Sequence, residues 1–299
     1  MNAISIIKQS KHILTNYYLS HKKLPYLASF KITHRCNLTC HQCPFYKLKT
    51  PDIPYHQALK TLDKLYERGN RIVIFEGGEP SLWKDNEYNI NTLVYEAKNR
   101  FVCVGMTTNG INSLDIPVDV LWVSIDGFEE THNALRRANV YQSIIKNVIN
   151  SNHPKLYAHI TINALNYQEI PDLIKHLSKI FKGITIQFYY PYDQKFDLYL
   201  NQKNRIDTIN GIIKLKKNGY PVFNSISALE ALKFNSWSCK DWLIDNANPD
   251  GTIIQGCYLK TRSDIDCSKC GFSPHTEISL AFNMNIRSII AGYKIFFSN

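Results

Sequence analysis

Seven of the eight cysteines in this chain fall into two groups whose spacing suits metal chemistry. The first cysteine group has three residues between its first two members and two before its third, and consists of Cys36, Cys40 and Cys43. Thiolate is a preferred ligand of both zinc and iron–sulfur clusters. Zinc would take His34 or His41 as a fourth ligand, whereas a [4Fe–4S] cluster held by three cysteines keeps one iron open for chemistry.

The second cysteine group lies near the C-terminus and consists of Cys239, Cys257, Cys267 and Cys270. Four thiolates can close a [4Fe–4S] cluster completely, and a structural zinc ion would accept the same four ligands. The eighth cysteine, Cys103, stands alone in an apolar run and is predicted to be a buried side chain. The N-terminus lacks the continuous apolar segment of a secretory signal, so we expect a cytoplasmic protein with reduced thiols.

The first cysteine group resembles the signature loop of the radical S-adenosylmethionine (SAM) superfamily. That family usually has an aromatic residue before the third cysteine, where this chain has Gln42. Downstream, Gly77-Gly78-Glu79-Pro80 follows an apolar strand and resembles the family motif whose backbone receives the amino group of SAM. The resemblance implies a [4Fe–4S] cluster on the first cysteine group, with SAM bound at its open iron.

Two further segments, Thr107–Gly110 and Ser124–Gly127, resemble family positions near the ribose and carboxylate of SAM. Each segment lies at the end of an apolar strand. Asn-Gly and Asp-Gly pairs such as theirs are also common in ordinary turns. The SAM contacts that the resemblance implies, besides the glycine motif, are Gln42, Thr108, Asn109, Ser124 and Asp126. Leu135-Arg136-Arg137 resembles the family's Leu-Arg-Gly segment, with Arg137 in place of the glycine. No acid–base pair is visible, so the cluster ligands are the only catalytic residues that we predict.

Strand and helix patterns alternate through the first 220 residues, which predicts a parallel sheet built from βα units. The predicted strands are Ala28–Thr33, Arg71–Glu76, Phe101–Thr107, Val120–Ile125, Tyr157–Ile162 and Ile184–Tyr189. The predicted helices are Tyr55–Arg68, Ile90–Asn99, Tyr141–Asn150, Gln168–Phe181 and Asn201–Asn218. This α/β pattern agrees with the partial (β/α)6 TIM-type barrel of radical SAM enzymes. Every motif falls at the carboxyl end of a predicted strand, where such barrels place their functional groups.

The composition changes near Pro221, and we expect a small cysteine-rich extension over residues 221–299. Asp250-Gly251 predicts a hairpin turn between residues 247 and 254. The pattern resembles the auxiliary-cluster (SPASM or twitch-like) extension of some radical SAM enzymes, although five residues rather than four separate Gly251 from Cys257. The resemblance implies a second [4Fe–4S] cluster. The expected regions are therefore an N-terminal amphipathic helical segment (1–27), the barrel (28–220) and the extension (221–299).

The net charge of +10 favours acidic partners, although the basic residues are dispersed along the chain. No RNA-binding module is visible, and DNA is not an expected partner. Near the N-terminus, apolar residues at helical spacing lie beside basic ones, which predicts a helix packed on the barrel or lying peripherally on an anionic membrane. The apolar residues are Ile6, Ile7, Ile13, Leu14, Tyr17 and Tyr18, and the basic ones are Lys8, Lys11 and His12.

The family resemblance implies an enzyme that cleaves SAM reductively to a 5′-deoxyadenosyl radical, with flavodoxin or ferredoxin as the electron donor. The segment 267–275 faintly resembles the C-terminal cysteine segment of the radical SAM enzyme that adenosylates hopanoid lipids. We therefore expect a membrane lipid, such as a polyprenoid, as substrate. A peptide or protein, or a tRNA base, is the alternative. A non-catalytic iron–sulfur redox or sensor protein is disfavoured, because a sensor does not need the Gly77–Pro80 motif.

Overall fold

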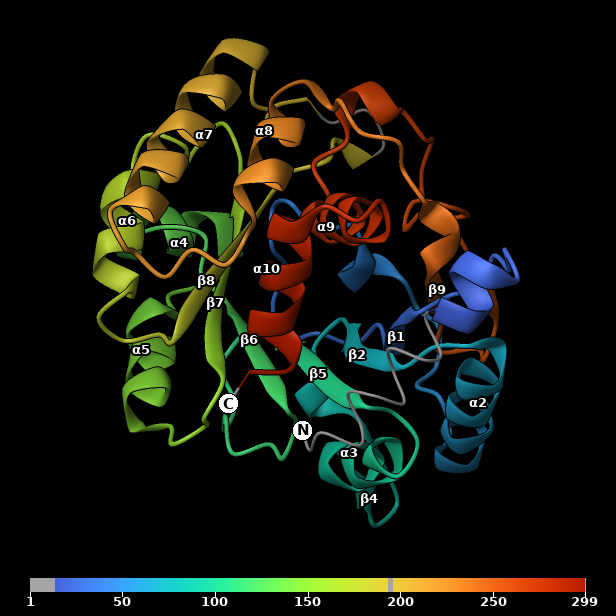
Figure 1. Cartoon of the computed structure of the whole chain (residues 1–299). Helices are drawn as coiled ribbons and strands as arrows, with labels where there is room; N and C mark the ends of the chain where they lie inside the picture. The colour runs from blue at the N-terminus through green and yellow to red at the C-terminus, as the bar shows by residue number, and fades with distance from the viewer. Residues whose placement is uncertain (1–13, 193–195, 299) are drawn as a thin grey trace.

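An eight-stranded sheet forms the centre of the computed structural model, which describes residues 14–192 and 196–298 (Figure 1). The strand order is β10-β9-β1-β2-β5-β6-β7-β8, and all neighbours are parallel except β10 and β9. The strands are β1 (Leu27–Thr33), β2 (Ile72–Gly77), β5 (Cys103–Thr108), β6 (Val120–Ser124), β7 (Leu156–Ile162), β8 (Gly183–Phe188), β9 (Ile244–Ala247) and β10 (Ile253–Gln255). The short strands β3 (Lys84–Asp85) and β4 (Tyr88–Asn89) form a separate hairpin.

Helices follow the parallel strands and cover the outer face of the sheet (Figure 1). These helices are α2 (Tyr55–Arg68), α3 (Ile90–Lys98), α4 (Glu129–Arg136), α5 (Tyr141–Asn150), α6 (Ile170–Leu177) and α7 (Gln202–Lys217). The predicted α/β fold class, with a partial barrel of βα units, is confirmed. The helix α6 is shorter than the sequence pattern predicts and has Pro171 in its first turn, where the missing proline N–H costs no helical hydrogen bond.

The sheet is wider than the six strands that the sequence predicts. β9 pairs in parallel with β1, Leu27 lying opposite Ile244, and β10 returns antiparallel beside β9. The turn between them contains Gly251 at φ +81°, a left-handed conformation that favours glycine. The hairpin predicted at Asp250-Gly251 is therefore confirmed. The C-terminal segment thus adds two strands to the same sheet that carries the first cysteine group.

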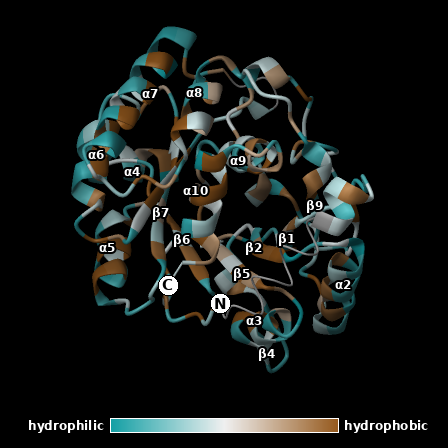
Figure 2. Cartoon of the chain, in the orientation of Figure 1, coloured by the Kyte–Doolittle hydropathy of each residue, from teal (hydrophilic) through white to brown (hydrophobic). Residues whose placement is uncertain are grey.

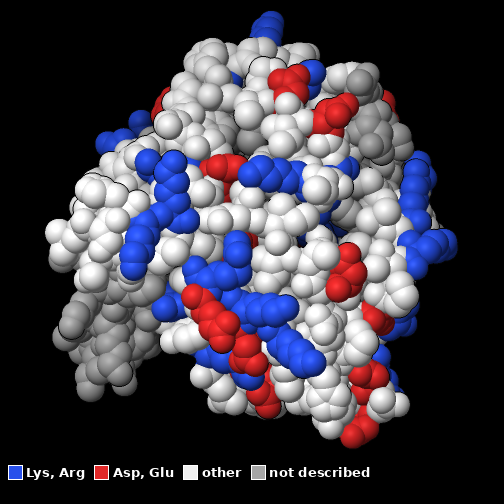
Figure 3. All heavy atoms as spheres, turned by 90° about the vertical axis from the view of Figure 1, so that its right-hand side faces the viewer, with Lys and Arg blue, Asp and Glu red and all other residues white. Residues whose placement is uncertain are grey.

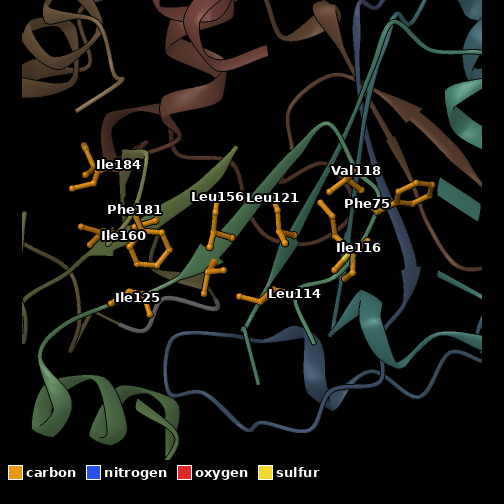
Figure 4. Packing of buried hydrophobic residues seen from close by; sticks show 14 of the residues in the cluster. Phe75, Leu114, Ile116, Val118, Leu121, Ile125, Leu156, Ile160, Phe181 and Ile184 are labelled. Atoms are coloured by element: carbon orange, nitrogen blue, oxygen red, sulfur yellow. The ribbon is translucent and has the colours of Figure 1, made fainter. Parts of the chain in front are cut away.

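Side chains alternate between the two faces of each strand. On β6, Leu121 and Val123 belong to the hydrophobic core between the sheet and the outer helices, whereas Trp122 and Ser124 line an inner cavity. Cys103, at the start of β5, is buried as predicted. Figure 4 shows part of the outer core, with the labelled side chains Leu121, Leu156, Ile160, Phe181 and Ile184.

The inner face of the sheet changes from apolar to polar along the strands. Leu27 and Ile72 line the cavity at the amino ends of β1 and β2, whereas Glu76, Ser124 and Gln187 line it at carboxyl ends. Polar groups are therefore concentrated at the end of the barrel where the motifs lie, as in other α/β barrels.

Three C-terminal helices follow the barrel: α8 (Ile226–Phe234), α9 (Ser273–Phe282) and α10 (Ile286–Phe296). Residues of α9 and α10 line the inner cavity, whereas α8 packs against α7, and its Leu229 and Leu232 belong to the outer core. Figure 1 shows α10 over the inner face of the sheet, where the Phe296 and Trp122 rings lie 6.0 Å apart. Apolar residues are visible on α10 in Figure 2, and Ile286 and Ile290 are exposed. None of the helices in the described part of the chain is both long and apolar enough to cross a membrane.

The described part of the N-terminal segment packs against the barrel. Residues 14–19 form a short π-helical turn in which the Tyr17 ring contacts the rings of Tyr26 and Phe282. The Tyr18 hydroxyl donates a hydrogen bond to the Phe282 carbonyl at 2.9 Å. Most of the predicted amphipathic helix, including Ile6, Ile7 and Ile13, lies outside the described residues.

Candidate active site

A cavity of about 880 Å³ runs through the inside of the barrel from the carboxyl ends of the strands to α9 and α10. Pockets that take small-molecule ligands are commonly about 300–1,000 Å³. At the strand ends the cavity is lined by most of the predicted site residues, namely Cys36, Cys40, Gln42, Cys43, Gly77, Gly78, Thr108, Asn109, Ser124 and Asp126. Glu79 and Pro80 do not line it. The fold thus brings together residues from four separate segments of the sequence.

The loop of the first cysteine group is fixed by hydrogen bonds to the segment after β5 and to helix α4. Asn109 Nδ2 donates to Asn37 Oδ1 at 2.7 Å, and the His41 N–H donates to the Leu135 carbonyl at 2.8 Å. Burial, with smaller contributions from the negative fields of Glu79, Cys40 and Cys43, raises the pKa of Cys36 to about 11. Burial also raises the pKa of Cys43. Neighbouring thiols in such surroundings suit a shared metal group, whose positive charge would stabilise the thiolates.

The two histidines that could complete a zinc site differ in their surroundings. His41 Nε2 lies 2.8 Å from Asp197 Oδ2, so this side chain already has a carboxylate partner. His34 is buried, and burial lowers its pKa to about 4. In the described part of the chain, no three His, Cys, Asp or Glu side chains converge as ligands of a single metal ion.

The glycines of the Gly77–Pro80 motif allow two backbone segments to approach closely. Gly77 has φ +143°, and a Cβ at Gly77 or Gly78 would overlap the carbonyl oxygens of Thr33 and Arg35, respectively. The Gly78 N–H donates to the Thr33 carbonyl and the Glu79 N–H to the Arg35 carbonyl, both at 2.8 Å. The two glycines therefore hold the motif against the segment that leads into the first cysteine group.

Glu79 connects this motif to the next strand end rather than facing the cavity. It is fully buried, and its Oε1 accepts hydrogen bonds from the Ser81 hydroxyl at 2.7 Å and the Thr108 hydroxyl at 2.8 Å. Its Oε2 accepts from the Asn109 N–H at 2.7 Å. The next residue, Pro80, begins a 3-10 turn. The Glu79 carboxylate thus holds two predicted SAM-binding segments in a fixed relative position.

Asp126 likewise connects the first cysteine group to neighbouring segments. Its Oδ2 accepts a hydrogen bond from Gln42 Nε2 at 2.7 Å and lies 2.7 Å from Arg136 Nη2. Its Oδ1 accepts from the Thr161 N–H at 3.0 Å. Arg136 Nη1 also lies 3.7 Å from Cys40 Sγ. Gln42, where the family usually has an aromatic residue, therefore ties the cysteine loop to the end of β6.

The second cysteine group lies in loops outside this cavity. Cys239 and Cys267 are exposed, whereas Cys257 and Cys270 are half-buried. Burial raises the pKa of Cys270 to about 12, and the negative fields of Cys257 and Cys239 add to this increase. The field of Cys267 similarly raises the pKa of Cys257. These four thiols are therefore close enough to interact, and burial makes the thiolates of Cys239, Cys257 and Cys270 unfavourable without a cation.

Aromatic side chains fill the space between the two cysteine groups. The Phe45 ring, two residues after Cys43, contacts the Tyr258 ring, which directly follows Cys257; their centroids are 6.0 Å apart. The Tyr258 and Phe272 rings are 5.5 Å apart. Both Tyr258 and Phe272 line the cavity. A molecule in the cavity would therefore contact the aromatic side chains that separate the two cysteine groups.

Two buried cations at this end of the barrel were not anticipated from the sequence. Lys31 is fully buried, donates to Glu76 Oε1 at 2.9 Å and lies 4.0 Å from the centre of the Tyr258 ring. The sequence did contain a signal that Lys31 faces inward, because Lys31 shares one face of β1 with Leu27 and Ser29. The other cation, Arg205, lies on the otherwise uncharged buried face of α7.

The molecular surface carries no continuous basic patch on the face shown in Figure 3. Lys and Arg side chains alternate there with Asp and Glu side chains. Elsewhere in the described chain, ion pairs such as Lys260 with Asp241 at 3.3 Å also bring opposite charges together.

The partial barrel, the three-cysteine loop and the glycine motif at adjacent strand ends define one class of protein. Residues 30–177 match the family model described as the radical SAM superfamily, and the chain belongs to that superfamily. The cofactors of this family are a [4Fe–4S] cluster and SAM.

Individual relatives share this core. The chain is 30% identical over 166 residues to the sporulation killing factor maturation protein SkfB of Bacillus subtilis, covering 51% of this chain and 39% of SkfB. It is 25% identical over 167 residues to the Fe-coproporphyrin III synthase of Methanosarcina barkeri, covering 50% and 40%, respectively. The chain thus spans about two fifths of the length of these curated relatives.

The structure of Streptococcus suis SuiB bound to S-adenosylmethionine is similar over nearly the whole fold. The TM-score is 0.64 at 13% identity, covering 95% of this chain and 72% of SuiB. SuiB has also been solved with its precursor peptide SuiA.

Proposed function

We propose that this protein is a radical SAM enzyme that modifies a peptide. The observation that carries the proposal is the single cavity shared by the first cysteine group, the two glycines and the polar strand ends. When bound, the [4Fe–4S] cluster and SAM supply a 5′-deoxyadenosyl radical by reductive cleavage. The protein's own contribution is to hold these cofactors, orient the substrate and keep water away from the radical.

The first cysteine group provides the cluster ligands Cys36, Cys40 and Cys43 in this proposal. The backbone of Gly77 and Gly78, open to the cavity, receives the amino group of SAM. Thr108, Asn109 and Ser124 line the same space. The Thr108 and Asn109 side chains are held by Glu79 and Asn37, so the backbone of these two residues and the Ser124 hydroxyl bind the remaining polar groups of SAM.

Two predicted contacts have a positioning role instead of contacting SAM. The carboxylate oxygens of Glu79 and Asp126 are already occupied by hydrogen bonds from the protein. These groups hold the loops that bind the cofactors, so their loss would displace the cofactors rather than remove a direct contact. Gln42 donates to Asp126 through Nε2, whereas its Oε1 has no protein donor and remains available to a ligand in the cavity.

The second cysteine group holds an auxiliary [4Fe–4S] cluster in this proposal. Four mutually interacting thiols are available. The Phe45, Tyr258 and Phe272 side chains, which line the cavity, separate these thiols from the first cysteine group. Such a cluster, with all four irons ligated by cysteine, is suited to electron transfer.

A peptide substrate is better supported than the membrane lipid that the sequence led us to expect. SkfB is named for maturation of a killing factor, and SuiB binds a precursor peptide. Neither of these two relatives is named for lipid chemistry. A similar level of sequence identity to the Fe-coproporphyrin III synthase shows that relatives of this chain are also named for products other than peptides. Reduced flavodoxin or ferredoxin would supply the electron, in the cytoplasm.

The test uses anaerobically reconstituted, reduced protein with SAM and measures 5′-deoxyadenosine. A low-molecular-weight peptide fraction and a total lipid extract from the source cells are added in separate arms, and each is examined for mass shifts. We expect deoxyadenosine to form, and to increase together with a mass shift in the peptide arm. The variant Cys40→Ala should abolish the product, while the control Cys103→Ala, which removes a cysteine outside both groups, should retain it.

Two results would contradict parts of the proposal. A lipid mass shift without any peptide change would restore the membrane lipid as substrate. A fully loaded cluster that yields no deoxyadenosine in any arm would overturn the enzymatic function and favour a redox or sensor protein.

A further inference from the structure

Arg205 is a buried charge on a helix that covers the outside of the barrel. It lies one turn into α7, and its side chain is almost inaccessible, with the whole residue 2% exposed. The guanidinium carbon lies 4.6 Å from the centre of the Phe188 ring at the end of β8. A buried cation is strongly unfavourable unless an anion compensates it.

The partners of this guanidinium are neutral. Nη2 donates to Asn235 Oδ1 at 2.9 Å and to the Cys270 carbonyl at 2.7 Å. Nε is buried without an acceptor. The acidic groups whose fields reach Arg205 from the described part of the chain are the Tyr199 phenol and the Cys270 thiol. The Tyr199 phenol also forms a hydrogen bond with the Arg205 side chain. No described carboxylate forms an ion pair with Arg205, and of the two acidic groups the Cys270 thiol is the one proposed as a metal ligand.

Asn235 and Phe188 also fix the turn that contains Cys267 and Cys270. Asn235 Nδ2 donates to the Cys267 carbonyl at 3.2 Å and to the Ser268 carbonyl at 2.6 Å. A Cβ at Gly271 would overlap the Phe188 carbonyl, and the Phe188 N–H donates to the Gly271 carbonyl at 3.0 Å. The turn is thus anchored to the barrel from both sides, and Arg205 cannot move away from it without breaking these contacts.

We propose that Arg205 is the counter-charge of the metal group bound by the second cysteine group. This inference rests on the proposed auxiliary cluster. A [4Fe–4S] cluster with four thiolate ligands carries net negative charge, which increases when the cluster is reduced. A fixed cation in a low-dielectric site, reinforced by the positive end of the α7 dipole, stabilises the reduced form and raises the reduction potential. Arg205 is therefore a positioning and charge-compensating residue, not a catalytic one.

The experiment uses the full chain carrying Cys36→Ala, Cys40→Ala and Cys43→Ala, so that only the second group can hold iron. The reduction potential is measured by anaerobic titration followed by electron paramagnetic resonance. Arg205→Met, which keeps the length of the side chain and removes its charge, should shift the potential to a more negative value. Arg205→Lys should shift it less, and the control Arg287→Met, at an exposed position on α10, should leave it unchanged.

A second readout compares urea unfolding of the metal-free and reconstituted proteins. Arg205→Met relieves an uncompensated charge in the metal-free protein and removes a compensating one in the loaded protein. We therefore expect a larger loss of stability, relative to the parent, in the loaded protein. A residue with a purely structural role would lower both stabilities equally.

The failures of the two proposals can be distinguished. Iron analysis of the parent that finds no iron at the second group would overturn the auxiliary cluster and this inference with it. A loaded cluster whose potential is the same in Arg205→Met and in the parent would overturn the role of Arg205 while leaving the auxiliary cluster in place.

Discussion

The Arg136 guanidinium lies 2.7 Å from the Asp126 carboxylate, and both side chains are buried. Asp126 follows β6, and Arg136 ends α4, so the pair closes the loop between them. Because Asp126 also accepts from Gln42 and Arg136 reaches Cys40 Sγ, this ion pair supports two positions of the cysteine loop. The pair is therefore one of the links between the strand ends and the first cysteine group.

Breaking the ion pair between Asp126 and Arg136 should lower the free energy of unfolding. Asp126→Asn leaves the Arg136 charge buried without its carboxylate, and removing one partner of a buried pair typically costs about 3–5 kcal/mol. Urea unfolding of the metal-free protein should show a loss of this order. The double variant Asp126→Asn with Arg136→Met should recover part of the loss, since it leaves no unpaired charge. A loss below about 1 kcal/mol, typical of an exposed pair, would contradict the structural role.

Gly78→Ala should displace the backbone of the Gly77–Pro80 motif, because the added Cβ overlaps neighbouring atoms. The new Cβ would meet the carbonyl oxygens of Arg35 and His34, so the backbone must shift, at a cost of about 1–3 kcal/mol. We expect this loss in urea unfolding, together with weaker SAM binding in calorimetry. The matched control is Gly211→Ala in α7, where the nearest atom is 3.8 Å from the added Cβ. It should keep SAM affinity and gain up to about 1 kcal/mol of helix stability. Unchanged SAM affinity in Gly78→Ala would contradict the proposed role of this backbone.

The strand ends could be predicted because each motif follows a short run of β-branched and apolar residues. Parallel strands end at the same edge, which brings Cys36, Gly78 and Asn109 together without any knowledge of side-chain contacts. The pairing of β9 with β1 was not predictable in this way. Its partners Leu27 and Ile244 are separated by more than two hundred residues, and no local pattern encodes such a contact.

The buried charges were missed for a different physical reason. Lys31 and Arg205 are polar residues that sequence patterns assign to the surface, and their burial depends on partners far along the chain: Glu76 for Lys31 and Asn235 for Arg205. Period-two alternation in β1 and the apolar face of α7 do contain a signal, since each cation occupies a position that should be apolar. The partners themselves could only come from the structure.

Arg137→Gly should stabilise the protein. Arg137 has φ +55° at the C-terminal end of α4, a left-handed conformation that costs a non-glycine residue about 1–2 kcal/mol. Glycine removes this strain but gains freedom in the unfolded chain, so we expect a net increase of about 0.5–1 kcal/mol in the free energy of unfolding. Arg137→Ala, which removes the side chain and keeps the strain, is the control and should not show the gain. A decrease in stability for Arg137→Gly would mean that the Arg137 side chain makes a compensating interaction.

Glu277 should make stability fall as the pH rises. Its Oε1 accepts from the Ser225 N–H at 2.5 Å, its Oε2 is buried without a donor, and burial raises its pKa from 4.5 to about 7. Between these two values the folded protein binds more protons than the unfolded chain, so the free energy of unfolding decreases with pH in this window. The full effect corresponds to about 3 kcal/mol.

Urea unfolding of wild type and Glu277→Gln, at pH values from about 5 to 8, isolates this contribution. Glutamine cannot ionise, so the stability of the variant relative to wild type should rise steadily across the window and level off above pH 7. Glu130→Gln, at an exposed position on α4, is the control and should track wild type throughout. A constant difference between Glu277→Gln and wild type would show that the Glu277 carboxyl ionises in the folded protein at its ordinary pKa, and that its burial does not penalise the charge.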